Sequence, residues 1–395
     1  MSRPAVDLVG PALYAGDPYP TYAWMRANEP VYWDDVNEIW GIARYDDVVR
    51  IEKDKATFIS SDTTKGGYRP NIPADTAIIG LDDPMHHKRR NLVSRRFTPR
   101  AASAWEDDIR SKVNRLLDGV ADNGGAAEIV TDLAAPLPAS MIGMLLGFDE
   151  ADWPRLVHWS EATIALGGGP PYMNDEGIGA AMEFAGACAE LFAAKRDQPG
   201  DDILTHYTTA EIDGCPIGEA VAIADSLLLL DGGAETTRTV IAHMILELAA
   251  NPGELAKLRA GADMAVAVEE FIRYVTPIHN MCRVASEDAD VGGTTIPAGH
   301  QVMLMYCSAN RDEDHFDDPE RLDVTRSPNP HLAFGFGTHF CLGASLARLE
   351  IKVFFEELLR RTSGWTPVPG AEPVWMPNAF VRGVESAAVQ FDFVS

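Results

Sequence analysis

The segment HLAFGFGTHFCLG, residues 331–343, carries the most information in this sequence. Its three glycines permit a tight backbone turn beneath the sulfur of Cys341. Residues 342–361 then predict a helix, whose positive amino end would point at a Cys341 thiolate. A thiolate ligand to iron needs such a setting, with the sulfur shielded from water and backbone N–H groups aimed at it. Phe334 is placed to cover the sulfur.

Two other interpretations apply to a cysteine in a glycine turn. An isolated cysteine is more often a small buried apolar residue than a ligand. A nucleotide-binding loop is disfavoured, because Gly335 and Gly337 lack a third glycine and Phe340 stands in its place.

The stretch FGFGTHFCLG, residues 334–343, resembles the signature F-G-x-G-x-[HR]-x-C-x-G of the cytochrome P-450 family at every defined position. The resemblance implies a non-covalent haem b with Cys341 as its proximal iron ligand. It also implies that four further residues of this loop hold the cofactor, with His339 at a haem propionate. These residues are Phe334, Gly335, His339 and Gly343.

A second constellation is DGGAETT, residues 231–237, inside a predicted helix. Two glycines in mid-helix cost about 2 kcal/mol relative to alanine, and they allow close approach of a flat ligand. A threonine hydroxyl here can bond back to a carbonyl and distort the helix. The segment resembles the family stretch that crosses the distal haem face, which makes Glu235 and Thr236 the acid–alcohol pair delivering protons for dioxygen activation.

Two further groups resemble family features. Glu270 and Arg273, followed by Arg321, match a buried structural network beneath the haem, although Leu322 replaces the usual phenylalanine. The other group comprises cations for the haem propionates: His86 and Arg90, which lie on one helical face, and Arg283. Zinc binding is an alternative for His86, His87, His331 and Cys341, but their spacing matches no zinc pattern.

Apolar periodicity predicts a mainly α protein with a minor β part, and with the resemblance a cytochrome P-450 fold over a single domain, 1–395. The haem is expected between the long distal helix and the cysteine loop. Predicted helices are 19–28, 44–53, 86–97, 104–121, 133–146, 216–250, 254–274 and 342–361. Predicted strands are 31–42, 284–293, 301–305 and the tail from 374.

Composition limits the function further. A formal net charge of −26 disfavours nucleic-acid binding. The five cysteines are widely spaced without a C-x-x-C pair, which fits a reducing cytoplasm. The N-terminus has no signal-peptide pattern, and ionisable residues within 220–250 disfavour a membrane span there.

The resemblance implies a monooxygenase that uses dioxygen. No flavin, nicotinamide or cluster motif is present, so electrons are expected from a ferredoxin and its reductase. The basic run 88–100, with Arg348 and Lys352, is either a docking surface for an acidic ferredoxin or a solvated face.

A bulky lipophilic substrate is expected, since the candidate pocket elements 60–82, 167–171, 278–281 and 378–381 are rich in small and apolar residues. Residues 279–284 and 377–383 resemble actinobacterial steroid side-chain hydroxylases; terpenoids, fatty acids and polyketides stay open. Two other classes are a haem-binding sensor, which needs no proton relay, and a peroxide-driven haem-thiolate enzyme, which needs no ferredoxin. The predicted pocket residues are Ala234, Ile278, Met281 and Phe380.

Overall fold

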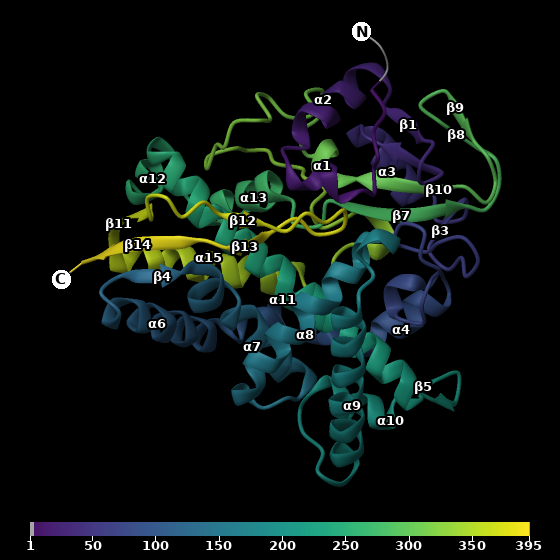
Figure 1. The fold of residues 1–395 in the computed structure, drawn as a ribbon. Coiled ribbons are helices and arrows are strands. Elements are labelled where there is room, and N and C mark those ends of the chain that lie inside the picture. Colours follow the sequence, from purple (N-terminus) through teal and green to yellow (C-terminus); the bar gives the residue numbers. More distant parts are fainter. Residues whose placement is uncertain (1–3, 395) are drawn as a thin grey trace.

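Helices dominate the computed structural model, which describes residues 4–394 (Figure 1). The mainly α prediction is confirmed. The helices are α1 (Pro11–Ala15), α2 (Tyr19–Asn28), α3 (Tyr45–Lys53), α4 (Met85–Val93), α5 (Pro99–Ser103), α6 (Glu106–Asp122), α7 (Pro136–Leu146), α8 (Trp153–Ala165), α9 (Asp175–Asp197), α10 (Ile203–Thr209), α11 (Glu219–Ala250), α12 (Pro252–Arg259), α13 (Met264–Val275), α14 (Tyr306–Ala309) and α15 (Ala344–Arg361).

Strands form a five-stranded sheet and several smaller pairings. They are β1 (Val31–Asp34), β2 (Ile39–Ile42), β3 (Phe58–Ile59), β4 (Ala126–Glu128), β5 (Glu211–Ile212), β6 (Cys215–Pro216), β7 (Asn280–Ala285), β8 (Ala289–Val291), β9 (Thr294–Ile296), β10 (Gln301–Met305), β11 (Thr362–Pro367), β12 (Val374–Trp375), β13 (Val384–Ser386) and β14 (Ala388–Phe393).

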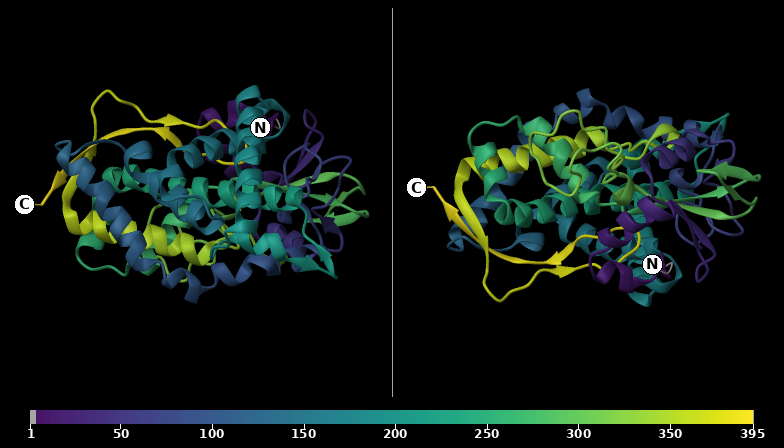
Figure 2. Two further views of the ribbon diagram at one scale, coloured as in Figure 1. Left: turned by 90° about the horizontal axis from the view of Figure 1, so that it is seen from below. Right: turned by 90° about the horizontal axis from the view of Figure 1, so that it is seen from above.

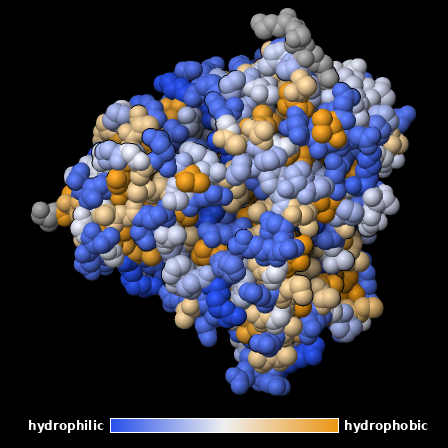
Figure 3. Space-filling view, in the orientation of Figure 1, coloured by the Kyte–Doolittle hydropathy of each residue, from blue (hydrophilic) through white to orange (hydrophobic). Residues whose placement is uncertain are grey.

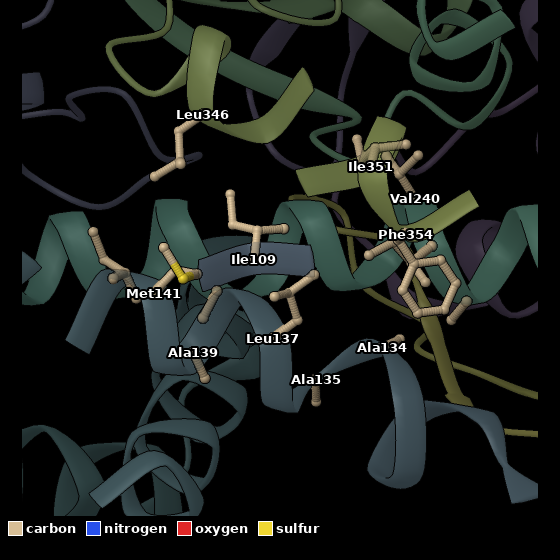
Figure 4. Packing of buried hydrophobic residues seen from close by; sticks show 14 of the residues in the cluster. Ile109, Ala134, Ala135, Leu137, Ala139, Met141, Val240, Leu346, Ile351 and Phe354 are labelled. Carbon is tan, nitrogen blue, oxygen red and sulfur yellow. The ribbon is translucent and has the colours of Figure 1, made fainter. Parts of the chain in front are cut away.

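The central element is α11, which runs through the middle of the molecule (Figure 1). From Val240 to Ile245 it is buried on all sides, as expected of a helix that is apolar around its whole circumference. It packs against α7, α8, α9, α13 and α15. Figure 4 shows part of this core, where residues from four helices meet: Ile109 of α6, Leu137 and Met141 of α7, Val240 of α11, and Leu346, Ile351 and Phe354 of α15.

The larger sheet has the strand order β1-β2-β10-β7-β3 and lies at the opposite end of the molecule from the C-terminal strands (Figure 2). Strand β10 pairs parallel with β2 and antiparallel with β7, which sets Val302 opposite Arg283. Every residue of β10 is buried. The sheet therefore holds Arg283 in a fixed position at the edge of the helical body.

Several predictions of secondary structure were wrong. The expected strand 31–42 is the hairpin of β1 and β2, and the expected strand 284–293 covers the end of β7 and then β8. The expected helix 254–274 is two helices, α12 and α13, because Gly261 takes a positive φ of 95° and Asp263 caps the next helix by accepting from Ala265 N–H. Helices α8, α9 and α10 were not predicted at all.

Helix α9 is long and apolar enough to cross a membrane by length and composition alone. Here it packs against α8, α10 and α11 through Phe184, Cys188 and Phe192, which are fully buried. Its outer side exposes Met182 at 71% and Ile178 at 43%. Figure 3 shows apolar colour among hydrophilic residues in the lower part of this face, where α9 lies.

Candidate active site

The cysteine loop leaves the Cys341 sulfur facing a cavity at the amino end of α15. Gly335 and Gly337 both take φ of 68°, and a Cβ on Gly337 would lie 2.7 Å from the Glu52 carbonyl oxygen. Burial raises the pKa of the Cys341 thiol, while the backbone N–H groups of Gly343 and Ala344 lower it, as do Arg90 and Arg348. The expected N–H groups at the sulfur are therefore present.

This cavity has a volume of about 500 Å³ and extends from Cys341 along α11 to the loop around Tyr68. Phe334, Gly335, His339 and Gly343 line it together with Cys341, so the structure brings the predicted loop residues to one surface.

Helix α11 forms the wall opposite the cysteine. Thr236 Oγ1 donates to the Gly232 carbonyl at 2.8 Å, as the sequence predicted, and both residues line the cavity. A Cβ on Gly232 would meet nothing within 4 Å, whereas one on Gly233 would lie 2.8 Å from Ile142 of α7. The first glycine thus opens the helix to the cavity, and the second allows close helix packing.

The two residues after these glycines, Ala234 and Glu235, turn away from the cavity. The prediction that Ala234 lines the substrate pocket was wrong: it is 2% exposed and packs in the core, because its direction on the helix differs from that of Gly232 and Thr236. Glu235 also points away from the cavity, paired with Arg238 at 2.7 Å and accepting from Ser160 Oγ at 2.8 Å. Burial raises the pKa of Glu235, and Arg238 opposes this shift.

Near the cysteine, four cationic or titratable groups converge with few anions. The rings of His86 and His339 contact each other at a 50° tilt, with centroids 4.2 Å apart. Neither ring nitrogen of the buried His86 has a hydrogen bond among the described residues, although Nδ1 lies 3.7 Å from Asp83. Burial, followed by Arg283, His86 and Arg90, lowers the pKa of His339 to about 2. Arg283 Nη2 lies 3.1 Å from Glu52, while Arg90 donates to the Phe340 carbonyl.

The walls beyond α11 come from segments far apart in the chain. Ile278, Met281 and Phe380 line the cavity, as predicted. The loops 60–82 and 167–171 contribute Tyr68, Arg69, Asp75, Ala77, Ile78, Ile79 and Gly167. Asp231 of α11 also lines it; sequence reasoning missed this residue, although an acid directly after the apolar run 227–230 is a signal for one.

Comparison with known proteins identifies the family. A family model described as Cytochrome P450 matches residues 264–382. A steroid C26-monooxygenase of Mycolicibacterium smegmatis is 36% identical over 99% of this chain and 97% of that protein. The chain belongs to the cytochrome P450 family. A methyl-branched lipid omega-hydroxylase of Mycobacterium bovis is 34% identical over 93% of this chain and 90% of that protein.

Among solved structures, a Mycobacterium marinum cytochrome P450 in complex with pseudoionone aligns with a TM-score of 0.90 and 33% identity. The alignment covers 99% of this chain and all of that one. The protein is thus a P450 monooxygenase with the P450 fold, and its cofactor is haem b.

The residues of this P450 fit haem b. A flat macrocycle needs an open helix face, which Gly232 supplies, and a thiol below it, which Cys341 supplies. Its two propionates need buried cations, and the nitrogens of His86, which have no hydrogen bond from the described residues, lie among such groups. Burial and, after it, repulsion from Arg283, His86 and Arg90 lower the pKa of His339, and anions would relieve the repulsion.

The buried network beneath the cysteine loop differs from its prediction. Glu270, fully buried, accepts from Arg273 at 2.7 and 2.8 Å, as expected. Arg321 is not its third member: its side chain is 55% exposed and pairs with Asp318. Arg326 takes that place, with Nε 3.1 and 3.2 Å from the Glu270 oxygens, because a turn after Leu322 folds the chain back.

The basic run does not form one continuous charged surface. Its members pair with acids as follows: Lys88 with Asp213, Arg89 with buried Asp225, Arg96 with Asp201, Arg348 with Glu269 and Lys352 with Glu356. Arg95 and Arg100 are exposed and have no ion pair among the described residues. The turn that carries Arg95 and helix α5, which carries Arg100, pack against α15, on the cysteine side.

Proposed function

We propose that this P450 hydroxylates the end of an alkyl side chain on a bulky lipophile, with a steroid as the first candidate. The observation that carries the proposal is the apolar cavity between Cys341 and Thr236, closed by Ile278, Met281 and Phe380. The names of two relatives, a steroid C26-monooxygenase and a methyl-branched lipid omega-hydroxylase, both denote oxidation at the end of a branched chain. Terpenoids, fatty acids and polyketides are the alternatives.

Cys341 is the proximal ligand in this proposal, and residues 1–395 act as one catalytic domain. When bound, haem b activates dioxygen and supplies the oxygen atom for insertion into a C–H bond. His86, Arg90, Arg283 and His339 hold its propionates. Phe334, Gly335 and Gly343 line the space around the sulfur and exclude water from it.

Thr236 holds the proton that the reaction consumes. Its hydroxyl, now donated to the Gly232 carbonyl, faces the cavity. Glu235 is the proton source in the proposal, and relay from it requires the Glu235–Arg238 pair to open, since Glu235 does not line the cavity. Substitution of Thr236 or of Glu235 tests each of these two roles.

Electrons come from a redox partner, which we propose is an acidic ferredoxin with its reductase, in the cytoplasm. Arg95 and Arg100, exposed on segments that pack against α15, are the charges that would steer it. A peroxide-driven enzyme would turn over with peroxide alone, whereas the proposal expects turnover only with a reductase system.

The ligand assignment is tested with the reduced carbon-monoxide complex, which has a red-shifted Soret band only when a thiolate ligates the iron. We expect Cys341→Ser to lose this band and Cys282→Ser, a change at a buried cysteine of β7, to keep it. Retention of the band in Cys341→Ser would refute the assignment.

The substrate assignment is tested by titration with a panel and the shift of the Soret band. Sterols with an intact side chain should displace water from the iron and give the strongest shift. If a linear fatty acid or a small terpenoid saturates the shift while sterols give none, the steroid assignment is wrong.

A further inference from the structure

The substrate cavity contains an acid that the proposed chemistry does not use. Asp231 of α11 lines the cavity, and no cation of the described residues lies within ion-pair distance of it. Glu235, one turn further along, is paired with Arg238 and turned away. The surroundings of Asp231 are otherwise largely apolar: Ile142, Ile164, Leu228, Ile278 and Phe380 line the same cavity.

Only one oxygen of this carboxyl group is satisfied. Thr163 Oγ1 donates to Asp231 Oδ1 at 2.7 Å, and no hydrogen bond from a described residue reaches Oδ2. Burial raises the pKa of Asp231 well above its ordinary value, with Thr163 opposing and Glu235 reinforcing the shift. Asp231 is half-buried, and an incompletely hydrogen-bonded acid in a largely apolar wall is costly, so a partner for the second oxygen would recover free energy.

A complementary polar group lies within electrostatic reach across the cavity. Arg69 Nη2 and Tyr68 Oη both donate to Asp75 Oδ2 at 3.0 Å, which fixes the two side chains. Arg69 Nε has no hydrogen-bond partner. Arg69 lowers the pKa of Asp231, and Asp231 raises the pKa of Tyr68, so these groups influence one another.

We propose that Asp231, together with Arg69, determines substrate specificity by binding a hydroxyl group of an otherwise apolar substrate. A hydroxyl both donates and accepts, so it matches an acceptor oxygen on one side and a free donor on the other. This inference rests on the proposed function and narrows its substrate class from lipophiles to lipophilic alcohols.

The position of Asp231 also limits where the hydroxyl is. Asp231 lies five residues before Thr236, about 7 Å along the helix axis at 1.5 Å per residue. The hydroxyl is therefore separated from the oxidised carbon by a short stretch of chain. A hydroxyl on a branched side chain or on an acyclic terpenoid meets this condition more easily than one at the far end of a ring system.

The test compares matched probes with and without a hydroxyl. Linalool and its deoxy analogue 3,7-dimethylocta-1,6-diene form one pair, and cholesterol and cholest-5-ene form another. In the holoenzyme, dissociation constants from calorimetry and Soret titration should favour linalool over its deoxy analogue by about tenfold or more, the effect of one well-placed buried hydrogen bond. The sterol pair, whose hydroxyl lies at the far end of the ring system, should show little preference. Asp231→Leu should abolish the preference for linalool, and the isosteric Asp231→Asn should retain part of it.

Equal affinity for linalool and its deoxy analogue in the wild type would overturn the inference. So would a preference that survives unchanged in Asp231→Leu. Thr163→Val removes the partner of the satisfied oxygen together with a hydrogen bond to the Trp159 carbonyl at 2.6 Å but keeps the carboxyl group of Asp231, and it provides a second variant if Asp231→Leu does not fold. If the wild-type protein lacked the thiolate band or did not oxidise side chains, the proposed function would be wrong. The calorimetric comparison depends on neither result, so the two failures can be told apart.

Discussion

The network around Glu270 gives a prediction that separates two arginines five residues apart. Arg326 Nε bonds both oxygens of the fully buried Glu270 carboxylate. Its other nitrogens donate to the carbonyls of Asp317 at 2.7 Å and Asp318 at 3.2 Å. We expect Arg326→Ala to destabilise the protein strongly, whereas Arg321→Ala should have little effect.

The size of the effect follows from these contacts. Removing one partner of a buried ion pair costs about 3–5 kcal/mol, and Arg273 still compensates part of the Glu270 charge, which favours the lower half of that range. Unfolding entropy of about 2.1 cal/mol/K per residue over 395 residues converts this to a fall in Tm of roughly 4–5 °C. Arg321 belongs to an exposed pair, for which about 1 kcal/mol is an upper value.

Thermal unfolding followed by circular dichroism and by the Soret band measures both variants. The Soret band also reports whether haem stays bound at the cysteine loop when the Glu270 network beneath that loop is weakened. The reasoning is refuted if Arg321→Ala lowers Tm as much as Arg326→Ala does, because Arg321 would then hold Glu270.

Three further outcomes follow from named contacts. Thr236→Ala should still bind substrate and consume reducing equivalents but release more of them as peroxide; unchanged coupling of electrons to product would remove Thr236 from the mechanism. Burial raises the pKa of Glu350 to about 8, so the native state keeps a proton that the unfolded chain releases near pH 4.5. The free energy of unfolding therefore falls by up to about 5 kcal/mol as pH rises from there to 8, and Glu350→Gln, which lacks this loss, should have a higher Tm than the wild type at the upper end of that window. Arg95→Glu should slow reduction by ferredoxin at low salt, with Arg155→Glu on α8 as the matched control, and a rate insensitive to salt would contradict steering.

The sequence was informative wherever local chemistry determines the structure. The glycines around Cys341 must take positive φ or leave space, and their spacing predicted the loop, as periodicity predicted α2 and β10 with their observed bounds. Helix α9 was not predicted because alanine and glycine occupy many of its positions on every side, so that no clear apolar stripe remains. The break between α12 and α13 depends on Gly261, which a helix would tolerate at a modest cost.

Long-range pairing was the part that the sequence could not supply. Whether Arg321 or Arg326 reaches Glu270 depends on how the chain turns after Leu322, and both arginines follow at similar spacing. The basic run appeared continuous because the acids that neutralise it, such as Asp213 and Asp225, lie more than a hundred residues away in sequence.

The two acids of α11 show the same limit at the centre of the site. Asp231 and Glu235 are four residues apart on one helix, so sequence assigned the acid role to the one in the family stretch. Glu235 is instead held by Arg238 and Ser160, whereas Asp231 presents its carboxyl group to the cavity. Under the two proposals these acids have different roles: Asp231 binds the substrate hydroxyl, and Glu235 donates protons only after its ion pair with Arg238 opens. Replacement of Asp231 should then alter substrate preference, while replacement of Glu235 should alter the yield of product per electron, because each acid contacts a different part of the site.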